Sequence, residues 1–163
     1  MIRKVKESDA PAICEMYNHY IRETVITFEE VELTSAEMLE RIRKVKDKFF
    51  WLVYEEDGKI LGYAYANTWR ERVAYRYSIE TSVYVAPKAK GKGIGKMLYK
   101  DLLNLLKEGG FKQIIGGITL PNKPSEKFHE YFGFKKVAHF SKVGLKFDQW
   151  HDVGFWQLDF SEE

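Results

Sequence analysis

The stretch Lys90-Gly91-Lys92-Gly93-Ile94-Gly95-Lys96 decides how this chain is interpreted. It lies between a β-rich run, Ser78 to Val85, and an amphipathic run that begins at Ile94. Glycines let the backbone approach a ligand closely, and the first N–H groups of a helix have no partner within it. The order strand, glycine turn and helix therefore predicts a site for an anion such as a phosphate.

The spacing of these glycines excludes two common phosphate motifs. A dinucleotide fingerprint needs a third glycine three residues after the second, and Lys96 stands there. A nucleotide-triphosphate loop ending at Gly95-Lys96 needs a hydroxyl at the next position, where Met97 stands. The pattern that fits is basic-x-x-Gly-x-Gly, from Lys90 to Gly95, and a basic β–α turn of an unrelated α/β protein is the alternative.

Length, charge and cysteine content set limits on the class of protein. The 163 residues suit one domain, and a single cysteine excludes an internal disulfide framework and a multi-cysteine metal site. Twenty-six basic and 24 acidic residues leave a net charge of +2, which argues against a dedicated nucleic-acid binder. The sequence shows no signal peptide and no membrane span, so the cytoplasm is the expected compartment.

Hydrophobic periodicity divides the chain into alternating strands and helices. Ser8 is the predicted N-cap of a first helix, and Thr34 to Glu37 form a capping-box pattern that starts a second. The predicted strands are 2–5, 49–55, 60–67, 76–85, 113–119, 137–146 and 153–160. The predicted helices end near Arg22, Val45, Gly109 and Phe132. Antiparallel strands followed by a β–α–β–α–β half predict a mixed α/β sheet in one domain.

This element order and the glycine turn resemble those of the GCN5-related N-acetyltransferases, in which the turn binds the pyrophosphate of coenzyme A. The family usually has Gln or Arg at the position of Lys90, so this chain departs from the pattern there. The segments around Asn122, His129-Glu130 and Gly133-Phe134 resemble the family's second coenzyme region. The runs 79–85 and 150–160 resemble the phosphinothricin N-acetyltransferases. The resemblance spans residues 1–163 and implies one domain, with a mostly antiparallel twisted sheet, flanking helices and strands splayed at the coenzyme site.

The resemblance also implies an activity. Members of this subfamily transfer acetyl from acetyl-CoA to the amino group of phosphinothricin or methionine sulfoximine, a small-molecule amine acceptor, without a metal and commonly as homodimers. Two alternatives remain for this chain. One is an acetyltransferase for a peptide N-terminus or a polyamine, and the other is a coenzyme-A-binding module without turnover.

Glu80 is the candidate catalytic residue. An amine is mostly protonated at pH 7, so acetyl transfer to it needs a general base. By the match, Glu80 occupies the family's strand position just before the backbone that holds the coenzyme. A carboxylate among Ile79, Val83 and Val85 is unusual for a sheet interior, and partial burial raises a carboxyl pKa toward the useful range. The alternative is a surface glutamate on an edge strand.

The coenzyme residues that the resemblance implies come from three segments. The strand backbone accepts the pantetheine arm and polarises the thioester carbonyl, whereas Asn122 and Ser125 have alternative roles as a turn residue and an N-cap. The full set is Val83, Tyr84, Val85, Gly91, Lys92, Gly93, Ile94, Gly95, Lys96, Asn122 and Ser125.

The residues expected to bind the acceptor lie mainly in the loop that precedes the strand containing Glu80 and in that strand. An arginine there can hold a carboxylate or phosphinate with two hydrogen bonds, and Arg70 is the better match to the subfamily's substrate loop. The candidate acceptor residues are Phe28, Arg70, Glu71, Arg72, Glu80, Thr81 and Ser82. The aromatic residues of the tail, Phe147, Trp150, Phe155 and Trp156, are expected in the core or a dimer interface.

Two residues have open roles in proton transfer. His129 either relays a proton or contacts the coenzyme, although a histidine on a helix face is more often structural. Tyr131 is a candidate donor of a proton to the leaving thiolate, against a default of aromatic core packing.

Overall fold

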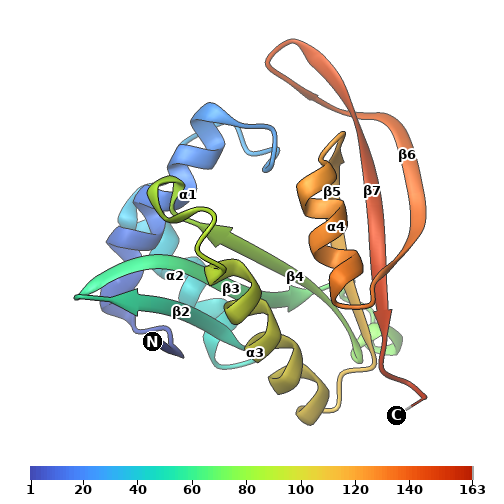
Figure 1. The fold of residues 1–163 in the computed structure, drawn as a ribbon, viewed down its shortest axis with the longest axis horizontal. Coiled ribbons are helices and arrows are strands. Elements are labelled where there is room, and N and C mark those ends of the chain that lie inside the picture. Colours follow the sequence, from blue (N-terminus) through green and yellow to red (C-terminus); the bar gives the residue numbers. More distant parts are fainter. Residues whose placement is uncertain (163) are drawn as a thin grey trace.

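The computed structural model describes residues 1–162, which form one seven-stranded sheet in the order β1-β2-β3-β4-β5-β7-β6 and four α-helices (Figure 1). The strands are β1 (Ile2–Lys4), β2 (Trp51–Glu56), β3 (Lys59–Thr68), β4 (Ser78–Val85), β5 (Gln113–Leu120), β6 (Lys135–Lys146) and β7 (Gln149–Asp159). The helices are α1 (Ala10–Glu23), α2 (Ser35–Lys46), α3 (Ile94–Glu108) and α4 (Lys123–Tyr131). The α/β fold and its mixed sheet were predicted from the sequence.

Local chemistry at the helix starts explains one prediction and corrects another. At α2 the capping box forms as expected: Glu37 N–H donates to Thr34 Oγ1 at 3.1 Å, and Thr34 N–H donates to Glu37 Oε2 at 2.7 Å. The prediction that Ser8 caps α1 is wrong. Ser8 lies in a single 3₁₀ turn, and α1 begins after Asp9, whose buried carboxylate binds Arg3 at 2.8 Å instead.

The pairing of β4 changes partway along the strand. On one side it pairs with β3 over its full length, from Gly62↔Val85 to Thr68↔Ile79. On the other side it runs parallel to β5 over three residue pairs, the last of which is Glu80↔Ile115. Beyond Glu80 the two strands diverge, while β5 keeps pairing with β7 to its end (Figure 1). The splayed strands predicted at the coenzyme site are therefore present.

The two faces of the sheet carry separate cores. Helix α3 contributes Leu98 and Leu102 to one core, which includes Ile79 from β4. Helices α1 and α2 contribute to the other core, which Tyr84 of β4 contacts. Because successive strand residues point to opposite faces, Glu80 and Ser82 share the face of Tyr84, and Thr81 faces α3. This alternation decides which β4 side chains can meet an acceptor.

The C-terminal hairpin is longer than its sequence suggests. Strands β6 and β7 begin at Lys135 and Gln149, two and four residues before the predicted starts, and β6 bulges between Phe140 and Gly144. Figure 1 shows the tip of this hairpin extending beyond the other strands of the sheet, beside the segment that joins α1 to α2. The hairpin tip therefore lies close to a segment from the first third of the chain. Within residues 1–162, no helix is long and apolar enough to cross a membrane.

Candidate active site

A groove of about 720 Å³ opens where β4 leaves β5. Its walls come from the second half of β4, the glycine turn, the first turn of α3 and the first turns of α4. Every predicted coenzyme residue except Lys92 lines it. These residues are Val83, Tyr84, Val85, Gly91, Gly93, Ile94, Gly95, Lys96, Asn122 and Ser125. Lys92 is exposed and does not line the groove.

The glycine turn has the backbone that an anion site needs. Gly91 and Gly93 take φ values of 83° and 77°, in the left-handed region that favours glycine, and Gly93 is the N-cap of α3. The first N–H groups of α3 are therefore presented at the groove without partners inside the helix. Lys90 and Lys96 add positive charge to the same rim. This turn can hold a pyrophosphate through backbone N–H groups.

Gly95 lines the floor of the groove, where a larger side chain would occupy the space open to a ligand. A Cβ added there would lie 3.5 Å from Val85 Cγ2 and 3.6 Å from Phe128 Cε2, and both residues line the groove. Any longer side chain at Gly95 would extend among groove residues. Across the groove, Asn122 Oδ1 accepts a hydrogen bond of 3.2 Å from Ser125 N–H, so Asn122 also caps α4.

Glu80 stands at the last pair between β4 and β5, on the fourth of seven strands. The alternative of an edge-strand glutamate is therefore wrong. Burial raises the pKa of the half-buried Glu80 carboxyl above its ordinary value, with no charged neighbour contributing. A carboxylate with a raised pKa at the mouth of the gap has the property that a general base needs.

The Phe155 side chain lies near this carboxylate, because Gly117 leaves room for both. A Cβ at Gly117 would lie 3.6 Å from Glu80 Oε1 and 3.2 Å from Phe155 Cε1, so the carboxylate and the Phe155 ring share the space over this glycine. The Phe155 ring packs edge-on against Trp69 at 5.5 Å, and the Arg70 guanidinium lies 5.2 Å from the Trp69 ring centroid. Phe155 therefore lies over Gly117, where the Glu80 carboxylate also lies, and packs against Trp69, the neighbour of Arg70.

The other predicted acceptor residues divide between two locations. Ser82 lies on the same face as Glu80, opposite Tyr65 in the register. Thr81 points to the other face, where its Oγ1 lies 2.6 Å from the buried Tyr99 hydroxyl on α3. This placement argues against Thr81 as an acceptor residue, because alternation along a strand separates it from Glu80.

Glu71 and Arg72 are exposed in the loop that follows Arg70. Phe28 lies on the segment between α1 and α2 and packs against the hairpin: its ring fills the space above Gly144, and the His151 ring centroid is 6.2 Å away. Arg70 thus lies over Trp69, which packs against Phe155, whereas Phe28 contacts β6 and β7.

The two residues with open proton-transfer roles differ in their surroundings. His129 is buried among Tyr99, Phe128 and Phe134, and its Nδ1 lies 2.8 Å from Ser125 O. Burial lowers the pKa of its imidazole below the ordinary value. Its Nε2 rests over Gly116, where a Cβ would lie 2.6 Å away. These contacts explain His129 as a structural residue.

Tyr131 was expected in the aromatic core, and that expectation is wrong. Its side chain is 67% exposed, and Lys96 Nζ lies 4.1 Å from its ring centroid. It therefore flanks the rim of the groove.

Several groove and site residues were missed by the sequence analysis. Tyr20 donates its hydroxyl hydrogen to the Val85 carbonyl oxygen, and Ile26 and Phe128 line the groove. Helical periodicity placed Tyr20 on a buried face but gave no sign of the groove. Phe155 was assigned to a core or interface, and only the pairing of β7 with β5 places it beside Glu80. Within residues 1–162, no three His, Cys, Asp or Glu side chains are arranged to hold a metal ion.

Comparisons with known proteins agree with this geometry. Residues 2–154 match the family model described as Acetyltransferase (GNAT) domain. The chain is 38% identical over 159 residues to a phosphinothricin N-acetyltransferase of Streptomyces viridochromogenes, covering 98% of this chain and 87% of the relative. It is 34% identical over 163 residues to an L-methionine sulfoximine/L-methionine sulfone acetyltransferase of Salmonella typhimurium, covering 99% and 95%.

A solved structure extends the similarity to three dimensions. The crystal structure of a GNAT superfamily phosphinothricin acetyltransferase from Sinorhizobium meliloti in complex with AcCoA superposes with a TM-score of 0.95. The two chains are 34% identical, and the superposition covers 99% of this chain and 89% of that one.

Proposed function

Since the chain belongs to the GNAT acetyltransferase family and is an acetyl-CoA-dependent N-acyltransferase, we propose that its acceptor is a small amino acid or analogue of the phosphinothricin and methionine sulfoximine type. The observation that carries the proposal is the half-buried Glu80 at the point where β4 leaves β5, with Phe155 nearby over Gly117 and packed against Trp69, the neighbour of Arg70. It supports a candidate base at the gap and a candidate anion-binding cation in the loop that leads into β4. An amino acid carries both an amine and an anionic group.

The residues of the groove fit acetyl-CoA. The N–H groups at the glycine turn and the first turn of α3 bind the pyrophosphate, and the lysines at the rim add charge. Beyond Glu80 the β4 backbone no longer pairs with β5, so it is available to the pantetheine arm and to the thioester oxygen. When bound, acetyl-CoA supplies an acetyl group activated as a thioester.

Glu80 performs the proton step in this proposal. It takes a proton from the acceptor ammonium, directly or through a water molecule, so that the nitrogen lone pair can attack. The C–N bond then forms as the C–S bond breaks, and the leaving thiolate takes the second proton released by the nitrogen, directly or through a water molecule, to become the thiol of coenzyme A. Arg70 and Ser82 orient the acceptor, and residues 1–163 act as one catalytic domain without a metal. Glu71 and Arg72 contribute charge at the outside of the loop that binds the acceptor.

Thiol release from acetyl-CoA tests the proposal against a panel of acceptors. The panel contains methionine sulfoximine, phosphinothricin, free amino acids, a polyamine and a peptide with a free N-terminus. We expect the highest kcat/KM for the first three classes. Preferred turnover of the peptide or polyamine would replace the proposed acceptor class. Tight coenzyme binding without turnover of any acceptor would indicate a coenzyme-A-binding module.

Arg70→Ala is expected to raise the KM for methionine sulfoximine about 10-fold or more and to change the KM for acetyl-CoA little, because a charge-assisted hydrogen bond to the acceptor anion is lost. Arg76→Ala is the matched control: Arg76 is also exposed and lies over a ring, that of Tyr77, at 4.7 Å. Steady-state kinetics in both substrates check the split. A rise confined to the KM of acetyl-CoA would move Arg70 to the coenzyme side.

We also propose that the chain forms a homodimer through the β6–β7 hairpin, in the cytoplasm. Large apolar side chains on this hairpin are about half exposed, which is typical of a surface that contacts protein. They are Val137, Phe140, Val143, Leu145, Phe147 and Trp150. Light scattering is expected to give twice the chain mass for the wild type and the mass of a monomer for Trp150→Glu. Tyr77→Glu, which changes an exposed aromatic residue outside the hairpin, is the control and should remain a dimer. A monomeric wild type would contradict the dimer.

A further inference from the structure

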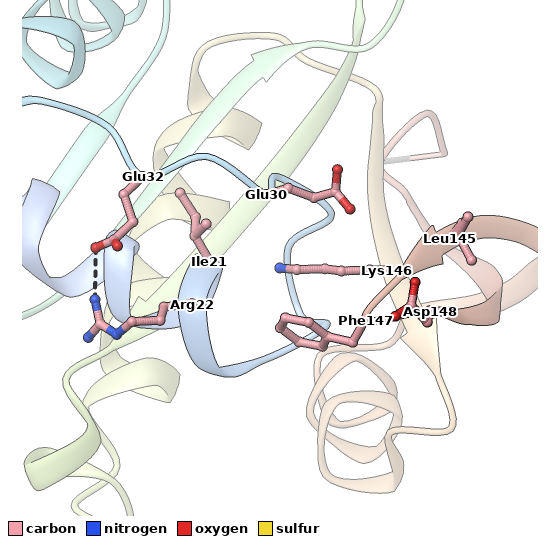
Figure 2. Close-up of a pocket in the computed structure, with 8 residues that line it drawn as sticks. All are labelled: Ile21, Arg22, Glu30, Glu32, Leu145, Lys146, Phe147 and Asp148. Atoms are coloured by element: carbon pink, nitrogen blue, oxygen red, sulfur yellow. Dashed lines mark hydrogen bonds and ion pairs between the residues drawn. The ribbon is translucent and has the colours of Figure 1, made fainter.

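Lys146 is a buried cation that the proposed chemistry does not use. The residue is 1% exposed, which is rare for lysine. Its Nζ donates a hydrogen bond of 2.8 Å to the backbone oxygen of Thr27, 119 residues earlier in the chain. Figure 2 shows the amine reaching from the end of β6 toward the segment between α1 and α2, between Glu30 and Phe147. One side chain therefore connects the C-terminal hairpin to the α1–α2 segment.

The surroundings of Lys146 act on the pKa of its amine in opposite directions, and burial is the larger effect. Burial lowers the pKa of the amine, whereas the carboxylates of Glu30 and Glu29 favour its protonated form. The neighbouring Arg22 does not compete with Lys146 for Glu30, because its guanidinium forms an ion pair with Glu32 at 2.8 Å (Figure 2). A protonated amine makes a stronger hydrogen bond than a neutral donor, so a protonated Lys146 stabilises the contact with the Thr27 carbonyl oxygen.

A second contact holds the next residue to the same hairpin. The Phe28 ring occupies the space above Gly144, where an added Cβ would lie only 2.2 Å from Phe28 Cε2. No side chain other than hydrogen fits at position 144 without moving this ring. Thr27 and Phe28 are thus both seated on the hairpin, one through a hydrogen bond and one through close packing.

The segment is also fixed from the side of the helices. Thr27 Oγ1 lies 2.8 Å from the Tyr17 hydroxyl, and Arg41 makes two hydrogen bonds to the Glu29 carboxylate, at 2.8 and 2.6 Å. Ile26, just before these anchors, lines the coenzyme groove, and Phe28, between them, is the candidate acceptor wall from the sequence analysis. A displacement at Thr27 would therefore act on both of its neighbours, Ile26 and Phe28.

We propose that Lys146 is a positioning residue for the acceptor: it holds the Thr27 carbonyl and thereby fixes Phe28 against Gly144, which sets the shape of the acceptor wall. This inference rests on the proposed function and on the sequence-based assignment of Phe28 to the acceptor wall. It assigns a role in substrate selection to a hairpin that contributes no residue to the coenzyme groove.

The test compares Lys146→Met with Lys135→Met, an exposed lysine on the same strand. We expect Lys146→Met to raise the acceptor KM about 10-fold, the effect of losing one charge-assisted hydrogen bond, and to leave the KM for acetyl-CoA within about 3-fold. Amide hydrogen exchange across residues 24–34 is expected to accelerate in this variant alone. Gly144→Ala, which keeps Lys146 but displaces Phe28, is expected to reproduce the rise in acceptor KM.

Two results would overturn the inference. One is a folded Lys146→Met variant with an unchanged acceptor KM, and the other is unchanged exchange across residues 24–34. The KM is measured with whichever panel acceptor the wild type acetylates. A wild type that acetylates none would defeat the proposed function, and hydrogen exchange, which needs no acceptor, would still decide whether Lys146 holds the segment.

Discussion

Glu80→Gln is expected to lower kcat/KM about 100-fold near neutral pH, in line with what a positioned general base contributes. The amide has nearly the shape of the carboxylate but cannot take a proton. In the wild type, the rate should fall as the pH drops through the raised pKa of Glu80, because only the ionised form is a base. This acidic limb of the pH–rate profile should be absent in the variant, and steady-state rates across pH check both effects.

The stability of the variant separates catalysis from folding. Since the pKa of Glu80 is higher in the folded protein than its ordinary value, ionisation disfavours the fold as the pH rises from the ordinary value through the raised one. Removing the charge should therefore leave the Tm at pH 7 unchanged or higher. Glu56→Gln, at an exposed end of β2, is the matched control. A pH–rate profile that keeps its acidic limb in Glu80→Gln would show that another group is the base.

The sequence predicted best where the cause of a structure is local. The left-handed conformations of Gly91 and Gly93 follow from glycine itself, and the α2 capping box needs only Thr34 and Glu37. The side-chain direction of Thr81 was also predictable, although we expected otherwise. Once Glu80 faces the acceptor, alternation places Ser82 beside it and sends Thr81 to the α3 core.

Contacts between distant segments could not be predicted in this way. Phe155 reaches Glu80 because β7, and not β6, lies beside β5, and periodicity carries no information on strand order. Lys146 reaches Thr27 because the hairpin extends past the sheet. Strand β7 of this hairpin begins at Gln149, and a polar residue at that position is typical of a loop, so the sequence did not predict the full length of the strand. The site therefore has a coenzyme half set by local motifs and an acceptor half set by tertiary packing.

Gly95→Leu is expected to weaken acetyl-CoA binding about 100-fold, which corresponds to about 2.7 kcal/mol, and to leave the fold intact. The Cβ itself fits, at ordinary contact distances from Val85 and Phe128, but the rest of the side chain must occupy the floor of the groove. The fold should tolerate the change, because Leu is favoured over Gly inside a helix by about 0.5–1 kcal/mol. Calorimetric titration with acetyl-CoA and thermal unfolding measure the two effects.

A graded series makes the steric cause explicit. Gly95→Ala adds only the Cβ and should reduce affinity slightly, whereas Gly95→Leu should abolish most of it. Lys100→Leu, at an exposed position of the same helix, adds comparable apolar volume outside the groove and should bind acetyl-CoA like the wild type. If Gly95→Leu bound acetyl-CoA with wild-type affinity, the coenzyme would have to lie away from the first turn of α3. The backbone N–H groups of that turn would then have no ligand to explain their exposure at the groove.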